Sequence, residues 1–123
     1  DPFGIISLML HLTAEEIEEF KAALDGEKDL LEEELAEHGR KVGDDWQGTA
    51  AGFNDNEPDD VDAADKMEEL TVNVALVEEL EKRYKEIRAA LQRMDEGKYG
   101  VTASGEPIDV ERLRANPAAA TNI

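Results

Sequence analysis

The chain has 123 residues, about the length of one domain, with 36% charged and only 5% aromatic residues. This composition argues against a broad globular core and favours long helices. The 31 acidic residues against 13 basic ones give a net charge of −18, which argues against binding to duplex nucleic acid, because such binding needs clustered Lys and Arg.

The N-terminal residues 1–12 are predicted to pack as a short buried segment, since apolar side chains are dense between Phe3 and Leu10. A basic region and a small-residue cleavage site are missing there, which argues against a signal peptide. Because the chain begins with Asp1 rather than Met, we expect some leading residues to be non-native. No apolar run approaches the roughly 20 residues of a membrane span, so we expect a cytoplasmic protein without membrane contact.

The first predicted helix runs from about Ala14 into the low forties. Thr13 followed three residues later by Glu16 is the pattern of a capping box. An apolar stripe then follows one helix face at steps of 3, 4, 7 and 4, which is narrow enough for a coiled-coil seam: Ile17, Phe20, Leu24, Leu31 and Leu35.

A second helix is predicted to return after a loop. Residues 48–57 have the composition of a loop, and Pro58 precedes a group of aspartates of which one can cap the next helix. Gly97 is the expected helix end. The predicted seam of this helix consists of Met67, Leu70, Val74, Val77, Leu80, Tyr84, Ile87, Leu91 and Met94.

The predicted fold class is all-α. Two helices of similar length joined by a polar loop make a long antiparallel coiled-coil helical hairpin over residues 13–97, with its tip near residues 48–65. Residues 98–123 contain turn residues and a few apolar anchors, and we expect them to pack with residues 1–12 as a small base.

Two motifs resemble the DksA/TraR family of bacterial transcription regulators. Residues 97–101 (Gly-Lys-Tyr-Gly-Val), 105–108 (Gly-Glu-Pro-Ile) and 111–119 look like the C-terminal zinc knuckle of that family. Residues 59–64 (Asp-Asp-Val-Asp-Ala-Ala) are similar to its D-x-x-D-x-A tip motif, and the resemblance covers about residues 13–123. Where the resemblance would place the family's four zinc-binding cysteines, this chain has Thr102 and Ser104 in place of the first pair and Asn122 in place of the third, and the given sequence ends at Ile123 before a fourth. Ser, Thr and Asn are poor zinc ligands. The resemblance therefore implies a degenerate zinc-finger-like tail that has lost its zinc, with no other cofactor.

The resemblance also implies a function. Members of the family bind RNA polymerase rather than DNA and insert the coiled-coil tip into the secondary channel, where acidic residues influence transcription initiation. By this resemblance Asp59, Asp62 and Ala64 are the candidate tip residues, and Trp46 and Phe53 beside the loop are secondary candidates. Some members respond to ppGpp through basic side chains, but the return helix of this chain is acidic, which argues against ppGpp binding.

Each of these interpretations has a simpler alternative. Asp59 and Asp62 also suit helix capping and solubility, and Trp46 and Phe53 also suit the closure of the hairpin's open end. No nucleophile with a base, phosphate-binding glycine loop or buried carboxylate pair is evident, so we do not expect an enzyme. The alternative function is a structural or adaptor coiled coil that has lost polymerase binding.

Overall fold

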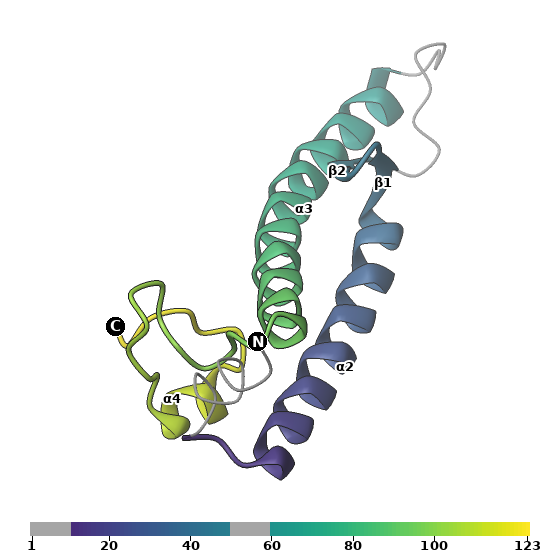
Figure 1. The fold of residues 1–123 in the computed structure, drawn as a ribbon. Coiled ribbons are helices and arrows are strands. Elements are labelled where there is room, and N and C mark those ends of the chain that lie inside the picture. Colours follow the sequence, from purple (N-terminus) through teal and green to yellow (C-terminus); the bar gives the residue numbers. More distant parts are fainter. Residues whose placement is uncertain (1–10, 50–59) are drawn as a thin grey trace. The chain divides into compact units, whose positions relative to one another are not determined.

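Figure 1 shows the elements of the computed structural model, which describes residues 11–49 and 60–123, with the backbone alone at residues 60–62. In chain order they are α2 (Ala14–His38), β1 (Gly39–Val42), β2 (Asp45–Gly48), α3 (Asp60–Asp95) and α4 (Val110–Ala115). The chain divides into two units. The terminal unit contains Asp1–Asp29 and Lys85–Ile123, and the central unit contains Leu30–Tyr84, so the boundary falls within both long helices. In the described part of the chain, no helix combines the length and apolarity that crossing a bilayer demands.

The ends of the two long helices follow from local sequence signals. At the start of α2, the backbone N–H of Glu16 donates to Thr13 Oγ1 at 3.0 Å, and the N–H of Thr13 donates to Glu16 Oε1 at 2.9 Å. This reciprocal pair confirms the predicted capping box. At the end of α3, Gly97 has a φ of 70°, and the N–H of Lys98 donates to the Arg93 carbonyl at 2.7 Å, which closes the helix with a Schellman motif.

The predicted apolar stripe of α2 is confirmed at four of its five positions. Phe20, Leu24, Leu31 and Leu35 are buried, and Ile17 is half-buried. On α3, Val77 and Ile87 are buried as predicted. Met67 and Val74 are 50% and 40% exposed, so the predicted seam is wrong at these two positions. Asn73 and Ala90 are buried instead.

A two-stranded sheet in the central unit corrects the all-α prediction and the extent of the first helix. α2 ends at His38, and β1 pairs antiparallel with β2 in the register Gly39–Gly48, Arg40–Gln47, Lys41–Trp46 and Val42–Asp45. Gly43, with a φ of 63°, supplies the positive φ that a tight hairpin turn needs at its first central position. Gly39 cannot be replaced easily, since a Cβ there would lie 2.5 Å from the Gln47 carbonyl oxygen. These constraints favour the strand hairpin over a continued helix.

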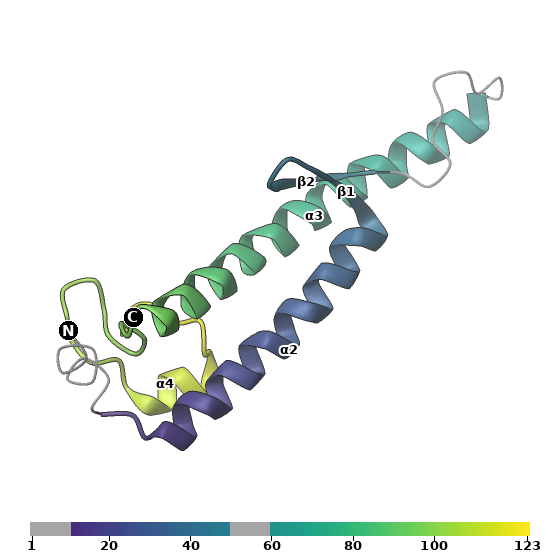
Figure 2. The same cartoon turned by 45° about the vertical axis from the view of Figure 1, so that its right-hand side comes forward.

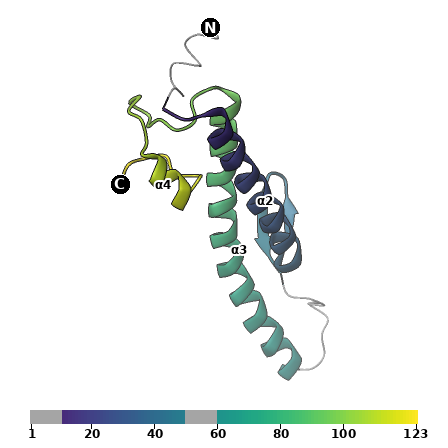
Figure 3. The ribbon, with the colours of Figure 1, turned by 90° about the horizontal axis from the view of Figure 1, so that it is seen from below.

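The C-terminal tail folds onto both long helices within the terminal unit. Tyr99, Ile108 and Leu113 are fully buried in its core. The ring of Tyr99 lies 6.2 Å from that of Phe20 on α2, and its hydroxyl donates to the Pro117 carbonyl at 2.6 Å. Burial raises the pKa of the Tyr99 phenol well above its ordinary value. Figure 3 shows the tail running from the end of α3 to α4 and on to the C-terminus.

Candidate partner-binding site

The acidic start of α3 carries the predicted tip motif. α3 begins at Asp60, so Asp62 lies in its first turn, and Ala64 follows on an exposed position. Asp65 and Glu68 add exposed carboxylates on the next turns. Negative side chains in the first turns of a helix interact favourably with its dipole, so the capping interpretation stays open here. Asp59 and Phe53 lie outside the described residues.

Trp46 lies beside a part of α3 that is remote from the tip motif. It is half-buried on β2 and lines a shallow pocket of about 270 Å³ together with Val74, Val77 and Glu78 of α3. Val74 is twelve residues after Asp62, which corresponds to about 18 Å along a helix. Figure 2 shows β2 beside α3, and Trp46 on β2 lines this pocket with side chains of α3 in the central unit. Its role toward a partner stays a prediction.

The strand hairpin is attached to α3 through one glycine and one buried amide. A Cβ on Gly48 would lie 2.5 Å from the Val74 Cα, so the backbone of β2 contacts the helix directly. Beside this contact, the side chain of Asn73 donates a hydrogen bond to the Thr49 carbonyl, and the N–H of Thr49 donates to the His38 carbonyl at 2.9 Å. These contacts fix the chain where it leaves β2. The sequence analysis did not predict these contacts of Gly48 and Asn73. The available signal was the polar Asn73 directly before the predicted seam residue Val74.

Thr102, Ser104 and Asn122, which the sequence resemblance places around the family's cysteine positions, form hydrogen bonds with neighbouring groups. The hydroxyls of Thr102 and Ser104 share a hydrogen bond of 3.0 Å, and Thr102 Oγ1 accepts from the N–H of Glu106 at 3.1 Å. Asn122 bridges the facing loop: its Oδ1 accepts from the N–H of Asp109 at 3.1 Å, and its Nδ2 donates to the Pro107 carbonyl at 3.2 Å.

This donor set does not fit a structural zinc ion. It offers two hydroxyls and one amide, whereas zinc sites are built from thiolates, imidazoles and carboxylates. Within residues 11–49 and 63–123, no group of three or more His, Asp or Glu side chains gathers in a ligating arrangement. Hydrogen bonds to the side chain of Thr102 and to and from that of Asn122 close the loops of the tail.

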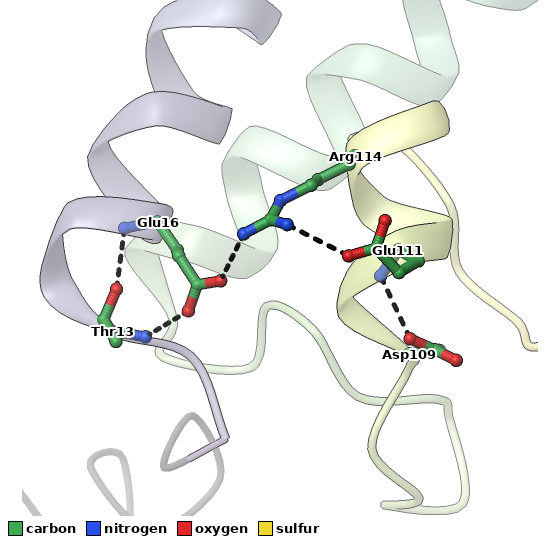
Figure 4. Close-up of polar contacts among 5 residues, drawn as sticks. All are labelled: Thr13, Glu16, Asp109, Glu111 and Arg114. Carbon is green, nitrogen blue, oxygen red and sulfur yellow. Dashed lines mark hydrogen bonds and ion pairs between the residues drawn. The ribbon is translucent and has the colours of Figure 1, made fainter.

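An ion pair ties α4 to the start of α2 (Figure 4). Arg114 lies 3.1 Å from Glu16 Oε2 and 3.0 Å from Glu111 Oε1. Asp109 caps the start of α4, because its Oδ1 accepts a hydrogen bond of 3.0 Å from the N–H of Glu111. The hydrogen bond from the Thr13 backbone lowers the pKa of the Glu16 carboxyl, and Arg114 adds to this effect. Glu16 thus serves both the capping box and the link between the two helices.

Comparisons with known proteins bear on the fold. No family model matches the sequence, and no curated protein matches it significantly. A search of solved structures finds the transcription factor DksA2 from Pseudomonas aeruginosa with a TM-score of 0.62 and 23% sequence identity, over 87% of this chain and 77% of that one. The similarity therefore rests on the three-dimensional arrangement rather than on sequence. It shows that the chain has a DksA-like fold, as the resemblance in the sequence implied.

Proposed function

We propose that this protein is an RNA polymerase-binding regulator of transcription initiation. In this proposal the segment of residues 48–65 enters the secondary channel of the polymerase, and the protein does not bind DNA itself. The observation that carries the proposal is the likeness of fold to the transcription factor DksA2, which extends over 87% of the chain. The tip motif of residues 59–64 supports it independently, since that motif is a feature of the sequence alone.

Residues 59–64 supply the chemistry that the proposal needs. Asp59 and Asp62 are the acidic groups that would act near the polymerase active site, and Ala64 gives the small side chain of the motif. A net charge of −18 suits entry into a basic channel that admits nucleotides. Exposed apolar side chains on α3, at Met67 and Val72, add surface that a channel wall can cover. Trp46 and Phe53 are the proposed secondary contacts.

The proposal asks for no catalytic residue and no structural zinc. In this proposal, the hydrogen bonds that Thr102 accepts and that Asn122 accepts and donates take the place of the family's cysteines in the tail. We do not include ppGpp, because α3 is acidic along Glu78, Glu79, Glu81 and Glu86, whereas binding this anion takes basic side chains. The proposed location is the bacterial cytoplasm, where the polymerase is found.

Binding of the purified chain to core RNA polymerase tests the proposal. We expect binding that a known secondary-channel factor competes away and that weakens as salt concentration rises, because the complementary charges are screened. A chain unfolded by heat and a polymerase already saturated with the competitor serve as controls. Failure to bind at micromolar concentration, or binding that the competitor does not reduce, would contradict the proposal.

A structural or adaptor role is the second candidate function. The observation that favours it is the lack of fit between the tail and a zinc ion, since this base differs chemically from that of the family. Under this alternative the protein keeps the fold but does not compete for the secondary channel. The same competition experiment therefore separates the two functions.

A further inference from the structure

The terminal unit contains a pocket that neither the fold comparison nor the proposed function uses. Its volume is about 740 Å³, which lies in the range of pockets that hold small organic ligands. The loop of residues 101–105 forms one wall, the C-terminal residues Ala120 and Thr121 form another, and Arg93 and Lys98 complete it. All of these residues belong to the same unit.

Arg93 is the unusual member of this lining. Its Nε atom is buried and has no hydrogen-bond acceptor, and its Nη2 atom reaches the Ala118 carbonyl only at the long distance of 3.5 Å. Among the described residues no carboxylate pairs with it. Two other arginines of the unit differ: Arg114 pairs with Glu16 and Glu111, and Arg112 donates to the Thr121 and Ile123 carbonyls. A partly buried guanidinium without a counter-charge is costly, and burial lowers the pKa of Arg93 accordingly.

The remaining lining defines the kind of ligand that fits. Val101, Ala103 and Ala120 make most of the wall apolar, and the polar groups beside Arg93 are the exposed ammonium of Lys98 and the hydroxyls of Thr102, Ser104 and Thr121. The pocket has two cationic side chains, and the protein as a whole carries a net charge of −18, which repels anions. A ligand with one negative charge therefore suits the pocket better than a ligand with several. The apolar walls call for an apolar ligand body.

We propose that this pocket binds a small organic monocarboxylate with an apolar body. The Arg93 guanidinium compensates the carboxylate charge, and the Ala103 and Ala120 walls cover the body. Guanidinium and carboxylate groups match in geometry and form strong charge-assisted hydrogen bonds. This site is independent of the tip segment and of polymerase binding, so either proposal can fail without the other.

Titration of the full-length chain with benzoate, followed by amide chemical shifts, tests the site. Benzamide is the neutral control of the same shape, and inorganic phosphate is the compact anion without an apolar body. We expect saturable shifts from benzoate at residues 98–105 and 120–121. Benzamide and phosphate should each bind at least about tenfold more weakly, corresponding to about 1.4 kcal/mol.

Variants of the pocket complete the test. Arg93→Gln should weaken benzoate binding about tenfold or more, while Arg88→Gln, an exposed position of α3 outside the pocket, should leave it unchanged. If Arg93→Gln does not fold, Ala120→Leu at an exposed wall position decides, because the larger side chain narrows the pocket at this wall and should weaken benzoate binding. Equal binding of benzamide, tighter binding of phosphate, no saturable shift, or full binding by Ala120→Leu would each overturn the proposal.

Discussion

The side chain of Asn73 on α3 donates a hydrogen bond to the backbone carbonyl of Thr49, the residue directly after β2. Asn73 is 8% exposed, so this amide is a buried polar group whose partner comes from a segment 24 residues away in sequence. Buried amides that lose their partner pay the full cost of desolvation. The bond therefore couples the end of the strand hairpin to the middle of the central unit's helix.

Replacing Asn73 by Ala should destabilise the protein by about 0.5–1.5 kcal/mol, because the half-buried Thr49 carbonyl loses its hydrogen-bond donor. Urea unfolding followed by circular dichroism measures the change. Gln92→Ala, which truncates an exposed amide on the same helix, is the matched control and should have little effect. Equal stability of the two variants would contradict the structural importance of the bond.

Two glycine substitutions should change stability in opposite directions. Gly48→Ala places a Cβ within 2.5 Å of the Val74 Cα and should be clearly destabilising, since backbone must move to accommodate it. Gly26 lies inside α2 with nothing within 4 Å of its Cβ position, so Gly26→Ala should stabilise the protein by about 0.5–1 kcal/mol. Thermal unfolding of both variants against the parent chain checks the pair. An unchanged melting temperature of the Gly48→Ala variant would show that the backbone of β2 does not contact α3 at Gly48.

The stability of the tail should not depend on zinc. Asn122→Ala removes both exposed hydrogen bonds that bridge the loop at Pro107 and Asp109, and should lower the free energy of unfolding by about 0.5–1 kcal/mol. A chelator such as EDTA, or added zinc, should leave the melting temperature of the parent chain unchanged. A fall in melting temperature on chelation would contradict the assignment of these residues as a metal-free closure.

The stability of the protein should fall at acidic pH partly through Glu16. Hydrogen bonding to Thr13 and the charge of Arg114 lower the pKa of this carboxyl in the folded state. The ionised carboxylate therefore stabilises the folded state at pH values above the carboxyl pKa of the unfolded chain. The contribution is lost as pH falls through the lowered folded-state pKa. Glu16→Gln should therefore narrow the gap in stability between neutral and acidic pH, measured by urea unfolding at each pH. Glu15→Gln, in the same helical turn, is the control and should leave the gap as it is.

The sequence was informative where one local signal decides the structure. The capping box at Thr13 and the helix end at Gly97 depend on residues a few positions apart, and both are observed. The apolar stripe of α2 also holds, because a periodic pattern places a whole face at once.

Tertiary contacts explain what the sequence did not show. The pairing of β1 with β2 ends the first helix earlier than the sequence predicted. The pair Gly43-Asp44 was the available signal for a turn at this place. Asn73 replaces Val74 in the buried stripe because β2 rests on α3 at this point. The burial of Arg93 Nε without a hydrogen-bond partner results from the way the tail folds, and no pattern along the sequence predicts it. Of the candidate site, Asp62 and Ala64 fall at the start of a helix as predicted, and their role toward a partner stays a prediction.

The tip residues should separate polymerase binding from the effect on transcription. Asp62→Asn removes one negative charge at the start of α3, and we expect it to abolish the effect on open-complex lifetime while binding to polymerase is largely kept. Asp65→Asn makes the same chemical change one turn later, outside the motif, and should behave like the parent chain. If Asp62 serves only as a helix-end charge or cap, its replacement instead changes stability by about 1 kcal/mol and leaves transcription unaffected. Open-complex lifetimes and urea unfolding of both variants, measured side by side, distinguish a functional carboxylate from a structural one.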